Sequence, residues 1–227
     1  TVAHSLIQVT GLGPLNGEGA GNVGAGGTFG GSGGRATCGA SAAPYYAADA
    51  VVGTIDTCTS VLMGSGGGSE GAGRGGGGVS ISGTTVSLAG VITADGESSA
   101  TANLGSGSGG GVCVQAQNLE VSGSINARGA RSIGNSGAGG GGRITLKYCD
   151  LDTAVTAKIL YHGGDGDNVC MNGAAGTWFT HQQCDDSVLA DMVFIDNNAL
   201  PTRAMTPIGD HLAMPAGVTL AALTAVK

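Results

Sequence analysis

One segment of the chain recurs with the same pattern of glycine and apolar residues. GGGVSISGTTVSLAGVITADG at 76–96 returns as GGGVCVQAQNLEVSGSINARG at 109–129, displaced by 33 residues without a gap. Self-similarity at such a period is typical of repeat architectures, in which each copy buries its apolar face against its neighbours. We therefore expect a stack of short strands rather than one closed globule.

Within each copy, apolar residues alternate with polar or small ones, which is the period of two expected of strands. The apolar positions are Val79, Ile81, Val86, Leu88, Ile92 and Ala94 in the first copy and Val112, Val114, Leu119, Val121, Ile125 and Ala127 in the second. Turns expected at 83–85 and 89–90 divide a copy into three short strands. Three such strands would form one coil of a parallel β-helix with these side chains inside.

Two later copies are less regular. The third begins with GGGGRITLKY at 139–148, and its last part fits only if two residues are inserted. A fourth, GAAGTWF at 173–179, places Thr177 and Phe179 at the inward positions. At the other end of the chain, SLIQVTGLG at 5–13 reads as the end of an earlier copy.

The sequence thus predicts an all-β fold, a glycine-rich parallel β-helix over residues 1–200 with ordered glycine-rich arms and disulfides. Its repeats are expected near 76–108, 109–138, 139–172 and 173–200. Residues 201–227 contain three of the five prolines and form a different element, an extended tail. The tail either covers its own domain or pairs with a neighbouring subunit. Its candidate assembly residues are Val218, Leu220, Leu223 and Val226.

Glycine supplies 47 of the 227 residues. Its tracts carry no strict period of three and the chain has few prolines, which excludes collagen. The tracts recur at a fixed phase just before an apolar strand, whereas flexible linkers have no reason to do so. We therefore expect ordered arms in which glycine allows neighbouring backbones to approach closely.

The cysteines are even in number and contain no CxxC pair, so zinc spacing is absent. They are Cys38, Cys58, Cys113, Cys149, Cys170 and Cys184. This pattern favours disulfides and an oxidising compartment, with buried free thiols as the alternative. Spacing alone leaves the connectivity open, and we expect sequential pairing: 38–58, 113–149 and 170–184.

Charge and hydropathy narrow the range of partners. The formal net charge is −7, and no cluster of Lys and Arg is interleaved with aromatic residues, so we expect no nucleic-acid partner. No apolar run reaches the roughly 18–20 residues that span a bilayer, and Thr1 is not followed by a signal-like segment, which suggests a mature or excised ectodomain. No N-x-[ST] acceptor occurs, which leaves O-linked glycans on Ser and Thr compatible with the sequence.

Candidate catalytic and metal-binding groups are few. The paired carboxylates are Asp150 with Asp152, Asp165 with Asp167, and Asp185 with Asp186. They form no ladder at one phase of the repeat, as a polysaccharide-cleaving β-helix would need. Asp165 and Asp167 in GGDGDN could bind calcium, although the segment also reads as an ordinary glycine turn. The histidines share no metal-binding spacing, so we assign no catalytic residue, cofactor or metal.

Several motifs in a fixed order resemble those of a known group of proteins. They are GGSGGR (30–35), GTIDTCTSVLMGSGGG (53–68), GGGGVSI (75–81), SGSINARG (122–129), GGGGRITL (139–146) and GAAGTWF (173–179). The set resembles the glycine-rich β-helix regions of large secreted or cell-surface proteins of plants, oomycetes and heterokont algae, and covers most of residues 5–200. More narrowly, the chain resembles a subunit of an extracellular filament such as the tubular flagellar hairs (mastigonemes) of those algae. It departs from the group at GGTFGG (26–31) and in its extra cysteines.

This resemblance implies a structural or surface role, with no catalytic residues to carry over. The ends of a β-helix also expose unpaired strands, and SLIQVTGLG begins as if in the middle of a copy, without a helical cap. We therefore expect an extracellular structural protein that assembles head to tail as a homo-oligomer. Two alternatives remain: a carbohydrate-binding or adhesive ectodomain that uses side chains on one face, and a polysaccharide lyase or hydrolase.

Overall fold

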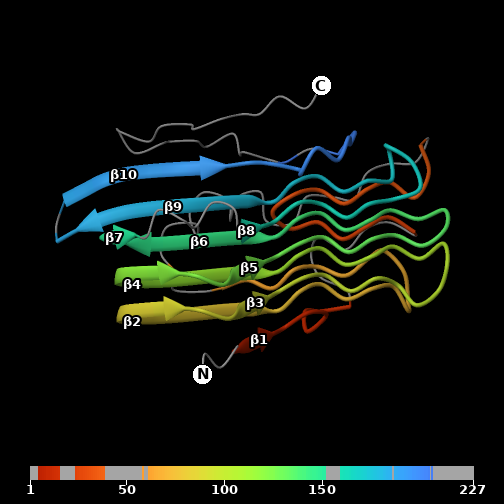
Figure 1. The fold of residues 1–227 in the computed structure, drawn as a ribbon. Helices are drawn as coiled ribbons and strands as arrows, with labels where there is room; N and C mark the ends of the chain where they lie inside the picture. The colour runs from red at the N-terminus through yellow and green to blue at the C-terminus, as the bar shows by residue number, and fades with distance from the viewer. Residues whose placement is uncertain are drawn as a thin grey trace.

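The computed structural model describes residues 5–15, 24–38, 58, 61–151, 159–185, 187–204 and 206 (Figure 1). All regular secondary structure in these residues is β, with no helix, as the alternating pattern predicts. The strands are β1 (Leu6–Gln8), β2 (Gly78–Leu88), β3 (Val91–Thr93), β4 (Gly111–Val121), β5 (Ser124–Asn126), β6 (Arg143–Tyr148), β7 (Asp150–Leu151), β8 (Ile159–Leu160), β9 (Thr177–Cys184) and β10 (Ser187–Phe194).

The strands form two sheets. The smaller has the order β1-β3-β5-β8, and the larger has the order β10-β9-β6-β4-β2, with β7 paired to β4. All pairings are parallel except that of β9 with β10. The first three copies therefore contribute to both sheets, whereas the fourth contributes only to the larger one, and the copies lie side by side (Figure 1).

The 33-residue displacement read from the sequence is also the register of the strands. β2 pairs with β4 from Gly78 opposite Gly111 to Leu88 opposite Val121, and β3 pairs with β5 with Ile92 opposite Ile125. Each of these residues lies beside its counterpart in the next copy, so equivalent side chains form rows across the sheet.

The expected division of a copy into three strands differs from the structure at one point, because strand pairing continues through the expected turn at 83–85. The turn at 89–90 is present, but residues 83–85 lie inside the continuous eleven-residue strand β2. Pairing with β4 continues through this segment, since Gly83 lies opposite Ala116 and Thr85 opposite Asn118. The chain still reverses its direction there: β6 runs parallel to the first half of β4 but points opposite to the end of β4, and β2 is in register with β4 (Figure 1).

The third copy fits the expected insertion. Leu151 lies opposite Leu119, a displacement of 32 residues, whereas Ile159 lies opposite Ile125, a displacement of 34. The difference of two residues falls in 152–158, outside the described residues.

The fourth copy is shifted by one residue from the expected alignment. Trp178 lies opposite Ile144 and Thr180 opposite Leu146, so these two side chains occupy the inward positions. The prediction of Thr177 and Phe179 as inward residues is wrong, because a shift of one residue moves every side chain to the other face of a strand. Trp178 belongs to the buried core and stacks on Phe194 with ring centroids 4.2 Å apart.

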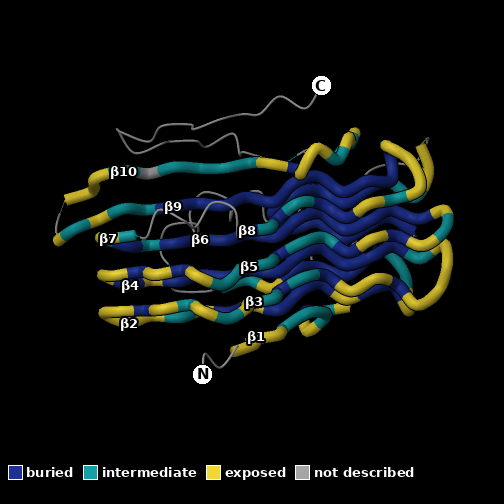
Figure 2. The backbone as a smooth tube through the Cα atoms, viewed as in Figure 1, coloured by how far each residue is buried: buried dark blue, intermediate teal, exposed yellow. Residues whose placement is uncertain are grey.

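The core lies between the two sheets and consists of the inward rows (Figure 2). Val79, Val112, Ile144 and Trp178 form one such row across four adjacent strands. Their side chains are all buried, and each contributes on the order of 1.5–3 kcal/mol relative to exposure.

The second half of each copy is a glycine-rich arm that runs away from the strands and returns to the next one (Figure 1). The arms are ordered and buried rather than linkers, as expected from their fixed phase. In the tract 134–142, successive backbone amides donate to three neighbouring segments in turn: 24–27, 171–174 and 127–130. The donor and acceptor pairs are Gly137 to Gly24, Gly140 to Gly27, Ala138 to Met171, Gly141 to Ala174, Gly139 to Ala130, and Gly142 to Ala127, at 2.7 to 3.0 Å.

A donor direction that repeats every third residue matches the three residues per turn of the polyproline II conformation. That conformation has no internal hydrogen bonds, so the neighbouring tracts supply the partners that water would otherwise provide. Glycine is required because the backbones touch: a Cβ at Gly139 would lie 1.8 Å from the carbonyl oxygen of Gly107, and one at Gly140 would lie 1.9 Å from that of Gly31.

The six cysteines form three disulfides: Cys38 with Cys170, Cys58 with Cys113, and Cys149 with Cys184. The expectation of disulfides is met, but the sequential pairing is wrong. Stacking places segments far apart in the sequence next to one another; for example, β9, which ends at Cys184, pairs with β6, which ends just before Cys149.

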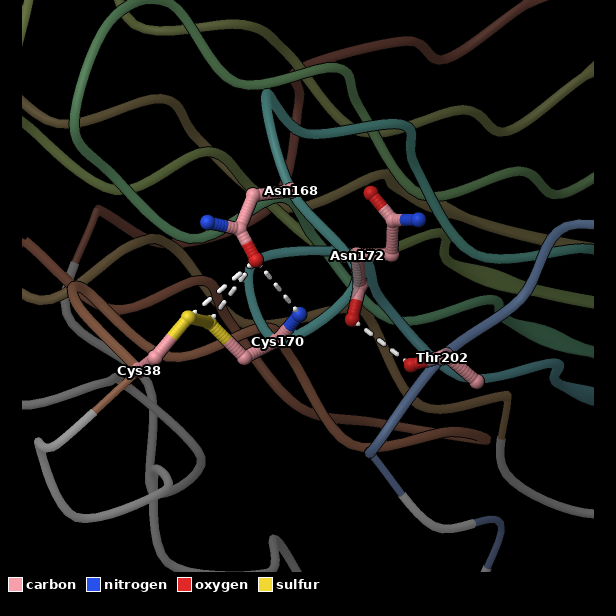
Figure 3. The surroundings of a disulfide bond; sticks show 5 residues. All are labelled: Cys38, Asn168, Cys170, Asn172 and Thr202. Carbon is pink, nitrogen blue, oxygen red and sulfur yellow. Dashed lines mark hydrogen bonds between the residues drawn. A yellow bond between two sulfur atoms is a disulfide. The ribbon is translucent and has the colours of Figure 1, made fainter.

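The Cys38–Cys170 bridge joins positions 132 residues apart and has a defined polar environment (Figure 3). The side-chain oxygen of Asn168 accepts a hydrogen bond from the Cys170 amide at 3.3 Å. Beside it, the Thr202 hydroxyl donates to the Asn172 carbonyl at 2.8 Å. The hydrogen bond of Thr202 thereby holds the first residues of the tail against the loop that contains Asn168, Cys170 and Asn172.

Ile125→Asp tests the inward rows. Ile125 is fully buried, so an unpaired carboxylate there should destabilise the protein by about 4 kcal/mol or more and prevent folding. Glu120→Ala, at an exposed position of β4, the preceding strand in the sequence, should change the free energy of unfolding by less than about 0.5 kcal/mol. Urea unfolding followed by circular dichroism compares the two; equal stability would contradict the core assignment.

Gly140→Ala tests the packing of the arms. The added methyl group has no room against the Gly31 carbonyl, and we expect a loss of about 3 kcal/mol or more. Gly83→Ala is the matched control, because its nearest neighbour is a Val86 methyl group at 3.3 Å and its register partner is Ala116. This change should alter the unfolding free energy by less than about 1 kcal/mol. A tolerated Gly140→Ala would show that the arms do not touch.

Candidate functional site

One end of the stack presents two edge strands. β2 is the last strand of the larger sheet, and β1 is the last strand of the smaller one. In the described part of the chain, no strand pairs with the outer edge of either. β2, with the sequence GVSISGTTVSL, contains no charged residue and no proline. Leu6 and Ile7 of β1 are 62% and 40% exposed.

The other end is formed by β10, which pairs antiparallel with β9. The pairing is irregular between Val188 and Ala190, where the register shifts. Val188 and Leu189 are 56% and 58% exposed, so this end also leaves apolar side chains in solvent (Figure 2). The two ends of the stack are therefore chemically different edges.

The tail residues proposed for assembly, Val218, Leu220, Leu223 and Val226, lie outside the described residues. Their role stays a prediction. The described part of the tail ends soon after Thr202, which the loop of Asn172 holds in place.

A polar groove of about 760 Å³ lies where the long strands turn, on the outside of the larger sheet. One row of its lining side chains crosses four adjacent strands: Ser82 lies opposite Gln115, Gln115 opposite Lys147, and Lys147 opposite His181. These residues come from β2, β4, β6 and β9, one from each copy. Thr84, Gln117, Asn118 and Gln183 also line the groove and are exposed.

Several groups of the groove are held in place by the protein. The His181 ring lies 3.0 Å from the Gln183 side-chain oxygen. The side-chain amide of Gln183 donates a hydrogen bond to the backbone carbonyl of Asp185 at 3.2 Å. The Cys149–Cys184 disulfide joins two of the lining residues. The groove therefore combines fixed amide and hydroxyl groups with a rigid wall.

The outward face of the two regular copies carries a sequence signal for this groove. Positions 82 and 115 are polar in equivalent places of the two regular copies, facing away from the core. Alternation identifies the outward face, but the row becomes visible only when Lys147 and His181 are aligned, and the irregular third and fourth copies obscure that alignment.

The candidate carboxylates are dispersed. Asp150 and Asp185 both line the groove, whereas their sequence neighbours Asp152 and Asp186 lie outside the described residues. Asp165 and Asp167 are exposed. Among the described residues, no group of three or more His, Cys, Asp or Glu side chains could hold a metal ion.

The calcium candidate segment has the contacts of a structural turn. The Asp165 carbonyl accepts a hydrogen bond from the Ser132 amide at 3.0 Å, and the Gly166 amide donates to the Asn172 side chain at 2.7 Å. These bonds connect the turn to the neighbouring arm and to the loop of the Cys170 disulfide.

Two buried tyrosines give the stack a pH dependence. Tyr148 lines the groove and Tyr161 lies in the core cluster, and burial raises the pKa of both phenols above the ordinary value; the charge of Asp196 raises that of Tyr161 further. Above about pH 10 the unfolded chain loses these protons while the folded chain keeps them, so stability falls as the pH rises.

We therefore expect the unfolding free energy to be constant with respect to these groups below about pH 10 and to fall above it. The slope should reach up to about 1.4 kcal/mol per pH unit for each tyrosine. Urea titrations between pH 8 and pH 11 measure it. Tyr161→Phe should flatten the decline relative to the wild type, and an unchanged slope would contradict the assignment.

No family model, no curated protein and no solved structure matches the chain. The part of the chain that the structure describes contains no helix capable of crossing a lipid bilayer.

Proposed function

We propose that this chain is a structural subunit that assembles head to tail with copies of itself into an extracellular filament or surface appendage. The observation that carries the proposal is the edge strand β2, which has eleven residues, no charge and no proline. The order of glycine-rich motifs, which resembles secreted and cell-surface β-helix proteins, supports the same function.

An edge strand presents a row of unpaired backbone N–H and C=O groups that can pair with another chain. Proteins protect such edges with lysine, proline, bulges or very short strands. β2 has none of these devices, and its sequence is that of an interior strand. A second copy of this chain is the occupant that such an edge fits, because β2 already pairs in register with a copy of the same repeat.

The two ends of the stack differ, and this difference determines the kind of assembly. β1 and β2 form one end and β10 forms the other, so a contact between them joins unlike surfaces. A contact between unlike surfaces that does not close into a ring produces an open filament. We infer that the β10 end of one subunit meets the β2 end of the next, with the tail as an additional strand at the joint.

In this proposal each subunit is a short parallel β-helix whose coils are extended sideways by the glycine arms. Pairing between subunits continues the sheets along the filament axis, and the arms stack beside them. The three disulfides favour an oxidising, extracellular location. A protein built in this way resists extension because backbone hydrogen bonds connect every copy to the next.

The test is a pair of charge-matched variants. Ser80→Lys/Ser87→Lys places two lysines at exposed positions of the edge strand β2, which should prevent pairing with a second copy. Ser122→Lys/Asn135→Lys adds the same charge at exposed positions that are not part of β2. Sedimentation velocity and electron microscopy should show polymers for the wild type and the second variant, and monomers for the first.

A wild-type protein that stays monomeric at high concentration would overturn the proposal, as would equal polymerisation of both variants. Circular dichroism must show that both variants are folded. Removal of residues 216–227 then separates the contribution of the tail from that of the β2 edge.

A further inference from the structure

We propose that the groove on the larger sheet binds a neutral polysaccharide chain that lies across the strands. This binding goes beyond assembly and uses other groups: the groove is lined by outward side chains, including those of Ser82 and Thr84 on β2, whereas assembly uses the backbone edge of that strand.

The first argument is the spacing of the polar groups. Ser82, Gln115, Lys147 and His181 occupy one row, with one side chain per strand. Neighbouring strands lie about 4.8 Å apart, so the row repeats a polar group at that interval over four strands. A linear polysaccharide presents hydroxyl groups at a similarly regular interval along its chain. A ligand that runs across the strands can therefore meet one row member after another.

The second argument is the chemistry of the lining. Most of its exposed polar groups are amides and hydroxyls, including Thr84, Gln117, Asn118 and Gln183. Such groups both donate and accept hydrogen bonds, as sugar hydroxyls do. The ionisable groups are of both signs, with Lys147 and His181 near Asp150 and Asp185 along the lining. This mixture lacks the single sign of charge that recognises a polyanion or a polycation.

The third argument is preorganisation. The His181–Gln183 contact and the Gln183–Asp185 hydrogen bond hold side chains that would otherwise lose freedom on binding. The row residues stand on paired strands, and the Cys149–Cys184 disulfide stiffens the wall. A rigid array of weak donors and acceptors is suited to a rigid, repetitive, uncharged ligand, because little ordering accompanies each new hydrogen bond.

The experiment uses co-sedimentation of the full chain with insoluble β-1,4-glucan, β-1,3-glucan and chitin. Dextran sulfate and gelatin, as a polyanion and an unfolded polypeptide, compete in parallel assays. We expect binding to at least one of the neutral polysaccharides. Gln115→Ala/Gln117→Ala should weaken it about tenfold or more, because two amides are removed from the middle of the groove.

Glu120→Ala is the matched control: it lies on the same strand β4, is exposed, and is outside the groove. Its affinity should equal that of the wild type. The proposal is overturned if no neutral polysaccharide binds, if the double variant binds as well as the control, or if dextran sulfate or gelatin displaces the bound sugar. The Ser80→Lys/Ser87→Lys variant should retain binding while losing polymers, which keeps this result separate from that on assembly.

Discussion

The main-chain contact between glycine tracts is the constraint on which the rest of the structure depends. Each tract continues a strand at one of its ends, so the spacing of the tracts and that of the strands must agree. Backbone hydrogen bonds hold neighbouring tracts together, and a Cβ at Gly139 or Gly140 would lie within 2 Å of a carbonyl oxygen. Only glycine allows neighbouring arms to lie as close together as the strands that they continue, which are about 4.8 Å apart.

The two faces of the strands have different roles: inward side chains form the core, and outward side chains are available for function. Inward rows such as Val79, Val112, Ile144 and Trp178 are buried and leave little freedom of sequence. Outward positions carry no such demand, and the polar row of the groove occurs there. The proposed sugar binding thus uses a face that the core does not constrain, whereas the proposed assembly uses the backbone of β2, a strand that also supplies Val79 and Val86 to the core.

The regular part of the fold could be predicted because two copies match without a gap. Displacement by 33 residues is the register of β2 with β4, and alternation identifies the buried face. Prediction failed where the copies lose that regularity. In the fourth copy a shift of one residue exchanged Phe179 for Trp178 at an inward position, since both are aromatic and the pattern alone accepts either. At 83–85 the sequence indicated the change of direction but not that strand pairing continues through it.

By itself the sequence determined the all-β class, the repeat, the ordered state of the glycine arms and the inward residues of the regular copies. It could do so because alternation and glycine content are local properties of the chain. Only the tertiary structure decided the disulfide partners, the two unlike ends and the row from Ser82 to His181. These features join residues from different copies. Their positions depend on how many residues each copy adds before it returns to the sheet, and the irregular copies do not show that number in their sequence.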